Sequence, residues 1–260
     1  MFKLWRFLCL LAGLICAPWM ANAQQQTLVI ATNIYPPYVR EDVKNSFLPV
    51  LFDEIGKKMK VRFEYVIQPW KRCEQSVESL EAWGAIPYAR NAEREKNFLF
   101  SAPIYISDSK FFAYRDPQKS SDQSPPATYD DLRELRKWRI GGIQGYYYEP
   151  IFREAHIDTD YALSEQQNFM RLQLGRIDLF PAAVTVGWSI INDLFPREIA
   201  ANFYTLEKPL SNGGTVHLMT SKRYPDNDAL LQRFNQALLT VRANGTFAQL
   251  VEEFGLTMRY

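Results

Sequence analysis

The chain has 260 residues, and its 30 lysines and arginines against 29 aspartates and glutamates leave a net charge of +1. Nucleic acids and anionic membrane surfaces select proteins with clustered basic charge, so we expect neither as a partner. Of the three cysteines only Cys73 lies beyond residue 23. We therefore expect no intramolecular disulfide in a mature chain that begins at Gln24, and a stability that comes from packing.

The N-terminal residues have the pattern of a secretory signal peptide. Lys3 and Arg6 precede an almost unbroken apolar run at residues 7–17, and the small-x-small sequence at residues 21–23 suits signal peptidase. The alternative is a membrane anchor, but the run has about a dozen residues where a spanning helix needs about 20. We expect a signal peptide at residues 1–23, a soluble mature chain in the periplasm and no stable membrane insertion.

Patterns of strand and helix alternate in the first part of the mature chain. Residues 28–32 form a short apolar run, and apolar residues between Leu48 and Met59 fall on one face of a helix. Residues 61–67 then alternate as in a strand, residues 70–80 have helical spacing, and residues 84–88 form another short strand pattern. This β-α-β-α-β order predicts a mostly parallel sheet.

A polar segment at residues 116–128, rich in proline and serine, is expected to be a surface loop, and the alternation restarts after it. Thr128 and Asp131 predict a capping box for a helix at residues 129–136, and Gly145 is expected to open another helix. Further strands are expected at residues 138–143, 177–180 and 215–220, and helices at 164–174, 183–194, 226–242 and from 246. The restart predicts two α/β lobes with the ligand cleft between them.

Five motifs, in this order, have the sequences and spacing of one known family. They are Asn33-Ile34-Tyr35-Pro36-Pro37-Tyr38, residues 91–105 with Glu93-Arg94 ahead of Phe100-Ser101-Ala102-Pro103-Ile104-Tyr105, residues 138–145, Leu174-Gly175-Arg176-Ile177-Asp178, and residues 243–247. Together they resemble the bacterial extracellular solute-binding proteins of family 3, the polar amino-acid type of ABC transporters. Pro69-Trp70-Lys71-Arg72 resembles a divergent branch with a Pro-Trp-x-Arg motif.

The resemblance implies the class II periplasmic binding-protein fold, an α/β fold of two lobes joined by a two-segment hinge. Residues 24–110 and 215–260 would form the first lobe and residues 111–214 the second. Such proteins capture a small-molecule ligand and deliver it to an ABC permease in the inner membrane. We expect a monomer that uses no cofactor and no metal ion.

The resemblance also assigns expected ligand contacts. Arg94 would meet a carboxylate of the ligand, because a planar guanidinium can give two parallel hydrogen bonds. Tyr35 and Trp70 would lie against the ligand's side chain, although Trp70 could equally be a core residue. Tyr146 and Tyr147, at the expected helix start after Gly145, would hold the carboxylate from the second lobe, since helix N-termini attract anions. Further cleft candidates are Arg72, Tyr88 and Arg90.

One departure from the family pattern leaves the ligand open. Amino-acid binders place an acidic residue, which pairs with the ligand's ammonium group, where this chain has Ala183. A buried ammonium group without a carboxylate partner would cost several kcal/mol. An amino acid held differently and a related organic acid, including dicarboxylates and aromatic acids, both remain open, as do short peptides. Glu165 is among the acidic residues without an assigned role.

Two other classes of function are considered. A few relatives on this fold act as dehydratases, and such chemistry needs a placed general acid or base. His156 and His217 have no sequence context that suggests a catalytic dyad, and Cys73 is expected to be a buried structural thiol. We therefore expect no catalytic residues and no enzyme activity. A ligand-sensing module for a membrane receptor would have the same fold and site, so the sequence does not separate it from a transport protein.

Overall fold

The computed structural model describes residues 25–117 and 124–260, so the expected signal peptide at residues 1–23 lies outside the described residues. The strands are β1 (Gln26–Thr32), β2 (Val61–Ile67), β3 (Gly84–Ala89), β4 (Phe98–Phe100), β5 (Tyr105–Tyr114), β6 (Ile140–Ile143), β7 (Thr159–Ala162), β8 (Phe180–Ala183), β9 (Phe203–Thr205) and β10 (Ser211–Ser221). The α-helices are α1 (Phe47–Met59), α2 (Trp70–Glu78), α3 (Glu149–Glu154), α4 (Glu165–Gln173), α5 (Val184–Leu194), α6 (Arg197–Ala200), α7 (Asn227–Ala243) and α8 (Thr246–Glu253). Short 3-10 helices are η1 (Val43–Asn45), η2 (Arg94–Lys96) and η4 (Leu132–Lys137).

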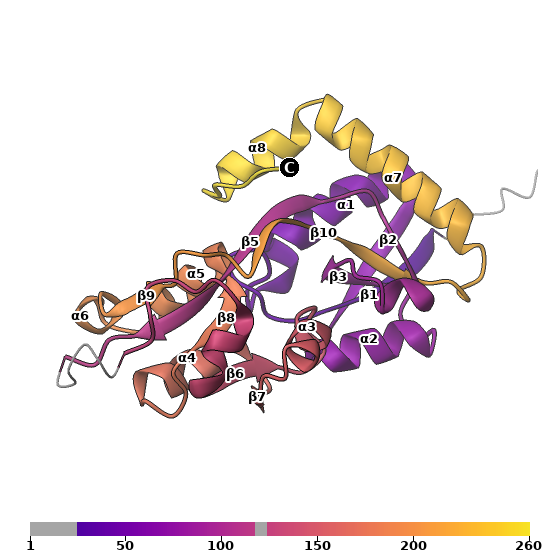
Figure 1. The fold of residues 1–260 in the computed structure, drawn as a ribbon. Helices are drawn as coiled ribbons and strands as arrows, with labels where there is room; N and C mark the ends of the chain where they lie inside the picture. Colours follow the sequence, from indigo (N-terminus) through magenta and orange to yellow (C-terminus); the bar gives the residue numbers. More distant parts are fainter. Residues whose placement is uncertain (1–24, 118–123) are drawn as a thin grey trace, which may run out of the picture.

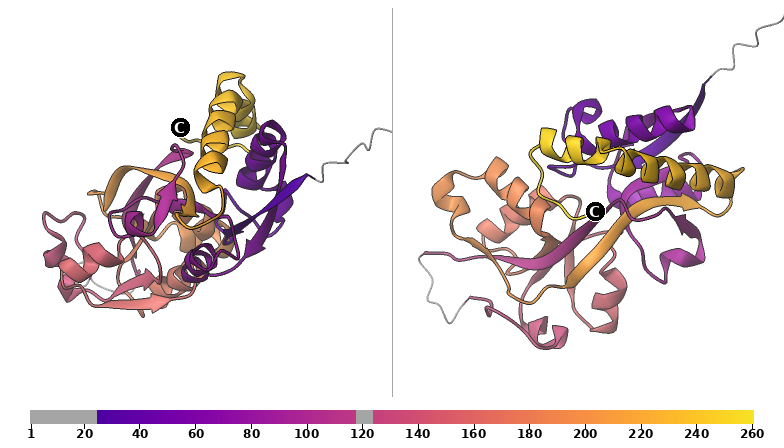
Figure 2. Two further views of the ribbon diagram at one scale, coloured as in Figure 1. Left: turned by 90° about the vertical axis from the view of Figure 1, so that its right-hand side faces the viewer. Right: turned by 90° about the horizontal axis from the view of Figure 1, so that it is seen from above.

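The elements form two α/β lobes (Figure 1). The first lobe holds β1 to β4 with α1, α2, α7 and α8, and the second holds β6 to β9 with α3 to α6. The long strands β5 and β10 pair antiparallel with each other and extend through both lobes (Figures 1 and 2). The two lobes are therefore connected by a continuous pair of strands.

The sheet of the first lobe follows the predicted strand–helix alternation. β1 pairs parallel with β2 on one side and with β3 on the other, which confirms the parallel β-α-β-α-β arrangement. β10 closes this sheet antiparallel to β3, and α1 and α7 pack together on one face while α2 lies on the other (Figures 1 and 2). In the second lobe β5 pairs with β8 and β9, and β6 pairs with β7 in a separate parallel ladder. Within the described residues no helix combines the length and the apolar character that crossing a membrane requires.

Large aromatic side chains fill the interior of the first lobe. Phe52 on α1 lies 5.1 Å from Phe234 on α7, centroid to centroid, and 5.4 Å from Phe63 on β2. The apolar residues predicted on one face of a helix between Leu48 and Met59 are buried here. Buried aromatic rings each remove a large apolar area from water, so these contacts hold the α1–α7 layer on the sheet.

Three predicted boundaries are wrong. The predicted helix at residues 129–136 is the 3-10 helix η4, and its capping box joins Asp131 to Glu134, because the Asp131 N–H donates to the Glu134 carboxylate over 3.1 Å. The strand predicted at residues 177–180 is β8, which begins at Phe180. The helix expected to open at Gly145 is α3, which begins only at Glu149.

Candidate functional site

A cavity of about 410 Å³ lies between the two lobes, within the size range of small-molecule sites. Both lobes and both connecting strands contribute to its wall. Its aromatic, hydroxyl and arginine side chains are Tyr35, Trp70, Tyr88, Tyr146, Tyr147, Ser107, Ser109, Ser211, Thr215, Arg90 and Arg94. The cavity therefore combines apolar faces, hydrogen-bonding groups and positive charge.

Aromatic rings from both lobes meet at the indole of Trp70. Its ring lies edge-on to Tyr35 at 5.2 Å, to Tyr88 at 5.8 Å and, across the cleft, to Tyr146 at 6.1 Å. The Tyr88 hydroxyl donates to the backbone carbonyl of Trp70 over 2.6 Å, which fixes both residues against each other. Trp70 is buried and lines the cavity, so it belongs both to the core and to the candidate site.

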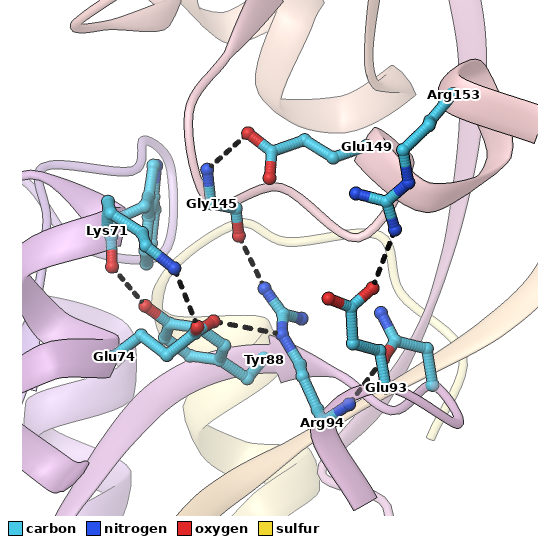
Figure 3. Close-up of polar contacts among 10 residues, drawn as sticks. Lys71, Glu74, Tyr88, Glu93, Arg94, Gly145, Glu149 and Arg153 are labelled. Atoms are coloured by element: carbon cyan, nitrogen blue, oxygen red, sulfur yellow. Dashed lines mark hydrogen bonds and ion pairs between the residues drawn. The ribbon is translucent and has the colours of Figure 1, made fainter.

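Arg94 lies in the cavity wall and joins the two lobes. Its side chain is 8% exposed, and Nη2 donates across the cleft to the carbonyl of Gly145 over 2.5 Å (Figure 3). Nη1 donates to Ala89 O over 2.7 Å, Nε to Glu74 over 3.3 Å, and the guanidinium lies 4.7 Å from the centre of the Tyr88 ring. These contacts fix the orientation of the guanidinium at the edge of the cavity.

The turn after β6 differs from the predicted anion site. Gly145 has a φ of +81°, and its N–H donates to the Glu149 carboxylate over 2.9 Å, as Figure 3 shows. Because α3 begins at Glu149, no helix N-terminus lies at Tyr146 and Tyr147. The prediction that a helix start binds an anion here is wrong. The two tyrosines nevertheless line the cavity, and the Tyr147 hydroxyl lies 3.2 Å from that of Ser211.

Hydroxyl groups on the connecting strands were missed by the sequence reasoning. Ser107 and Ser109 on β5 line the cavity, as do Ser211 and Thr215 on β10. The spacing of Ser107 and Ser109 places both side chains on one face of a strand. This alternation was the available signal, but only the pairing of β5 with β10 brings the four hydroxyls together.

Glu165 is a second residue that the sequence analysis did not assign. It is the first residue of α4 and is 1% exposed, although it carries a carboxylate. Its Oε1 accepts from Trp70 Nε1 over 3.1 Å and from the Tyr146 hydroxyl, whereas Oε2 is buried with no hydrogen-bond partner in the described structure. Burial raises the pKa of Glu165, against the opposing effect of its hydrogen bonds.

The remaining predicted residues lie in different places. Tyr88 and Arg90 line the cavity, and Arg90 is exposed and forms an ion pair with Glu95. Arg72 is exposed and does not line the cavity. Ala183 lies in the cavity wall, so the position at which the family pattern expects an acid is uncharged.

Neither of the two histidines considered for catalysis lines the cavity. His217 is buried, with Nδ1 2.7 Å from Ser101 O and Nε2 2.8 Å from the Thr215 hydroxyl, and burial lowers its pKa. His156 is exposed at the end of α3. Among residues 25–117 and 124–260, no group of His, Cys, Asp and Glu is arranged to hold a metal ion.

The thiol of Cys73 is expected to be inert in the native protein. It is fully buried in α2 and donates to the carbonyl of Gln68 over 3.3 Å, and burial raises its pKa to about 12. Thiolate is the reactive form, so we expect Cys73 to react with a disulfide reagent at least about 100-fold more slowly in the native protein than in denaturant. Absorbance of the released thiol measures both rates, and similar rates would show that α2 opens readily.

Comparisons with known proteins agree with this architecture. The model of the family described as bacterial extracellular solute-binding proteins, family 3, matches residues 28–257. ABC transporter arginine-binding protein 1 of Escherichia coli K12 is 26% identical over 166 residues, which cover 62% of this chain and 61% of that protein. The arginine-binding periplasmic protein of Mannheimia haemolytica is 24% identical over 246 residues, 90% of this chain and 93% of that protein.

Solved structures share the fold. The crystal structure of an arginine third transport system periplasmic binding protein from Legionella pneumophila has a TM-score of 0.72 and 20% identity. The alignment covers 88% of this chain and 99% of that one. This likeness confirms the two-lobed class II periplasmic binding-protein fold that the sequence motifs predicted.

Proposed function

Because the chain belongs to the bacterial extracellular solute-binding proteins of family 3, we propose that it captures an amino acid in the cavity between its lobes and presents it, in the periplasm, to an ABC permease of the inner membrane. The lobes would be residues 24–110 with 215–260, and residues 111–214. The residues that would contact the ligand are Tyr35, Trp70, Tyr88, Arg90, Arg94, Tyr146 and Tyr147.

The observation that carries this proposal is the position of Arg94. Its guanidinium is buried in the wall of a cavity to which both lobes contribute, and it contacts the second lobe through Gly145. A ligand carboxylate beside it would be desolvated and paired with a fixed planar donor, which is the strong form of this interaction. Closure of the lobes and capture of the ligand would then be one event. The arginine-binding names of the relatives support an amino acid as the ligand class.

The proposal includes release of the solute unchanged. The matching family is described as solute-binding proteins, and both ring nitrogens of the buried His217 are occupied by partners within the fold. General acid–base chemistry needs a group within hydrogen-bond reach of the reacting atoms, with a proton that is free to move. We expect mass spectrometry to recover the ligand intact after prolonged incubation. A ligand converted by the protein but not by heat-denatured protein would contradict this.

A thermal-shift panel of amino acids, organic acids, amines and short peptides tests the proposed ligand class. A ligand at a hundred times its dissociation constant adds about 2.7 kcal/mol to the free energy of unfolding. For a protein of this size that raises the melting temperature by about 5–10 °C. We expect at least one amino acid to produce this shift. A panel in which only organic acids or peptides stabilise the protein would overturn the proposal.

A further inference from the structure

Thr215 is a hydroxyl residue of the cavity wall with a buried histidine beside it. It lies on β10, one of the two strands that connect the lobes, lines the cavity and is partly exposed. Its hydroxyl oxygen lies 2.8 Å from Nε2 of His217, which is its only hydrogen-bond partner among the described residues. Side chains two residues apart share one face of a strand. The imidazole, which is 3% exposed and does not line the cavity, therefore supports the hydroxyl from the interior.

The hydrogen bonds of His217 determine which of its two nitrogens carries the proton. Nδ1 lies 2.7 Å from the backbone carbonyl oxygen of Ser101, and a carbonyl oxygen can only accept. Nδ1 therefore donates, and in the neutral imidazole Nε2 is left as an acceptor. It follows that the Thr215 hydroxyl donates its proton to Nε2 and offers only oxygen lone pairs to the cavity. Each bond in such a chain polarises the next, which makes this oxygen a better acceptor.

The neutral form of His217 is favoured by its surroundings. Burial lowers the pKa of its imidazole against the effect of the hydrogen bond to Ser101, and the charge of Arg90 lowers this pKa further. Tyr88 and Tyr105 lie on the two strands that flank β10, and burial raises their pKa values well above the usual range, so both phenols stay neutral. The accepting orientation of Nε2 is thus the resting state of the fold.

Strand β3 brings this acceptor close to Arg94. Nη1 of Arg94 donates to the carbonyl of Ala89, and Ala89 pairs with Val216, the residue next to Thr215. An α-amino acid carries its carboxylate and its ammonium group on neighbouring positions of one carbon atom. A ligand whose carboxylate lies at Arg94 can therefore place its ammonium group at Thr215. None of the described residues that line the cavity is an aspartate or a glutamate, and Ala183 is among them, so the ammonium group needs a different acceptor.

The other side-chain hydroxyls in the cavity are not committed in this way. The hydroxyl of Tyr147 lies 3.2 Å from that of Ser211, and either of the two can be the donor. Thr215 differs because its partner in the fold can only accept. Its proton is assigned before the ligand arrives, and no reorientation is needed to receive an N–H group.

We propose that Thr215 accepts a hydrogen bond from the α-ammonium group of the ligand, and that His217 is the positioning residue that holds the hydroxyl in its accepting orientation. This rests on the proposed function, and it gives the ammonium group a partner in place of the acid that is absent at Ala183. It also makes the connecting strand β10 part of the ligand site, so recognition of the ammonium group acts directly on a strand that joins the lobes.

Isothermal titration calorimetry with three amino acids, each beside its analogue without the α-amino group, tests the role of Thr215. The pairs are L-arginine with δ-guanidinovalerate, L-glutamine with glutaramate, and L-glutamate with glutarate. Within a pair only the ammonium group differs, so the ratio of the two affinities measures its recognition. We expect the wild-type protein to bind at least one of the amino acids about thirtyfold or more tightly than its analogue, as suits a hydrogen bond to a charged group.

Variants of Thr215 should change this ratio selectively. Thr215→Val has the same shape without the hydroxyl, and we expect it to reduce the ratio at least about tenfold while the analogue binds within threefold of wild type. Thr215→Ser keeps the hydroxyl and should keep the ratio within about threefold. Thr159→Val is the matched control, because it removes a strand hydroxyl on β7 that does not line the cavity, and it should bind like wild type. Melting temperatures of all three variants should stay within a few degrees of wild type.

The positioning role of His217 is read from its tautomer. The chain has only two histidines, and the spectrum of His156→Gln identifies the other signal. Long-range nitrogen–proton correlation NMR should show the proton of His217 on Nδ1, both in the free protein and in the complex with the amino acid. A proton on Nε2 would make Thr215 the acceptor of the imidazole proton and would contradict the assignment.

The remaining outcomes separate this inference from the proposed function. An unchanged affinity ratio in Thr215→Val, or an equal loss for the amino acid and its analogue, would overturn the role of Thr215 while leaving amino-acid binding in place. Wild-type protein that binds none of the three amino acids would also overturn it. If the thermal-shift panel then finds no other amino acid that binds, the proposed function itself fails.

Discussion

Replacement of Arg94 by alanine is expected to weaken ligand binding about thirtyfold or more while the protein stays folded. The side chain is buried at the cavity and spans the cleft through Gly145, so its loss removes both the proposed ligand partner and a contact between the lobes. Truncation of one partner of a buried, hydrogen-bonded charge pair typically costs 2–5 kcal/mol in binding, and about 2 kcal/mol corresponds to thirtyfold. Glu74 keeps its ion pair with Lys71, so the variant does not leave a buried carboxylate without any partner.

The effect of Arg94→Ala is measured by calorimetry with the best ligand of the thermal-shift panel. Arg62→Ala is the matched control, since it removes the same charge from an exposed ion pair on β2. It should bind like wild type. Arg94→Lys should recover little, because an ammonium group cannot replace the guanidinium fork that contacts Glu74, Ala89 and Gly145 together. An affinity of Arg94→Ala within threefold of wild type would contradict the proposal that Arg94 binds a carboxylate of the ligand.

The contacts that close the cleft are of unequal strength. Arg153 with Glu93, and Arg40 with Asp193, form ion pairs between exposed side chains. Exposed pairs contribute about 0–1 kcal/mol, and salt weakens them. The contacts from Arg94 to Gly145 and from Trp70 to Glu165 are buried, and three of these four residues, Arg94, Gly145 and Trp70, line the cavity. We therefore expect the buried contacts to contribute more to closure of the cleft than the exposed ion pairs.

The strand and helix pattern of the first lobe could be predicted from sequence because burial there follows regular spacing. The apolar face between Leu48 and Met59 and the alternation of residues 61–67 each correspond to an element of the structure, α1 and β2. Arg94 was selected by its sequence motif, and the structure places it in the cavity wall. Local patterns were sufficient in these cases because each of these features is set by residues that are close together in the sequence.

The site features that were missed depend on contacts between distant residues. Glu165 stands after a serine at a helix start, where an acidic residue is common, and only its meeting with Trp70 from the other lobe distinguishes it. The turn after Gly145 was mistaken for a helix because the pattern does not reveal that the Tyr148 hydroxyl accepts the N–H of Ile143. That buried contact holds residues 145–148 in turns, so α3 begins only at Glu149.

Replacement of Gly145 by alanine is expected to weaken ligand binding about tenfold or more by opposing closure of the lobes. A Cβ at this position would lie 3.0 Å from the backbone N and Cα of Lys71, which belongs to the opposite lobe. Backbone atoms of a helix cannot rotate away as a side chain can, and overpacking of this kind typically costs 1–3 kcal/mol. The penalty applies to the closed form, so it reduces affinity more than the stability of the ligand-free protein.

The positive φ of Gly145 adds a second penalty that must be separated from the first. Gly245 supplies the control, because its φ of +83° nearly equals the +81° of Gly145 and a Cβ there would meet nothing within 4 Å. Both Gly→Ala variants should lose about 1–2 kcal/mol of unfolding free energy from the left-handed backbone, and only Gly145→Ala should lose affinity. Small-angle scattering should show that the ligand compacts wild type and Gly245→Ala more than Gly145→Ala. If both variants bind as tightly as wild type, the Gly145–Lys71 contact does not control closure, and the affinity must be set by the side chains of the cavity alone.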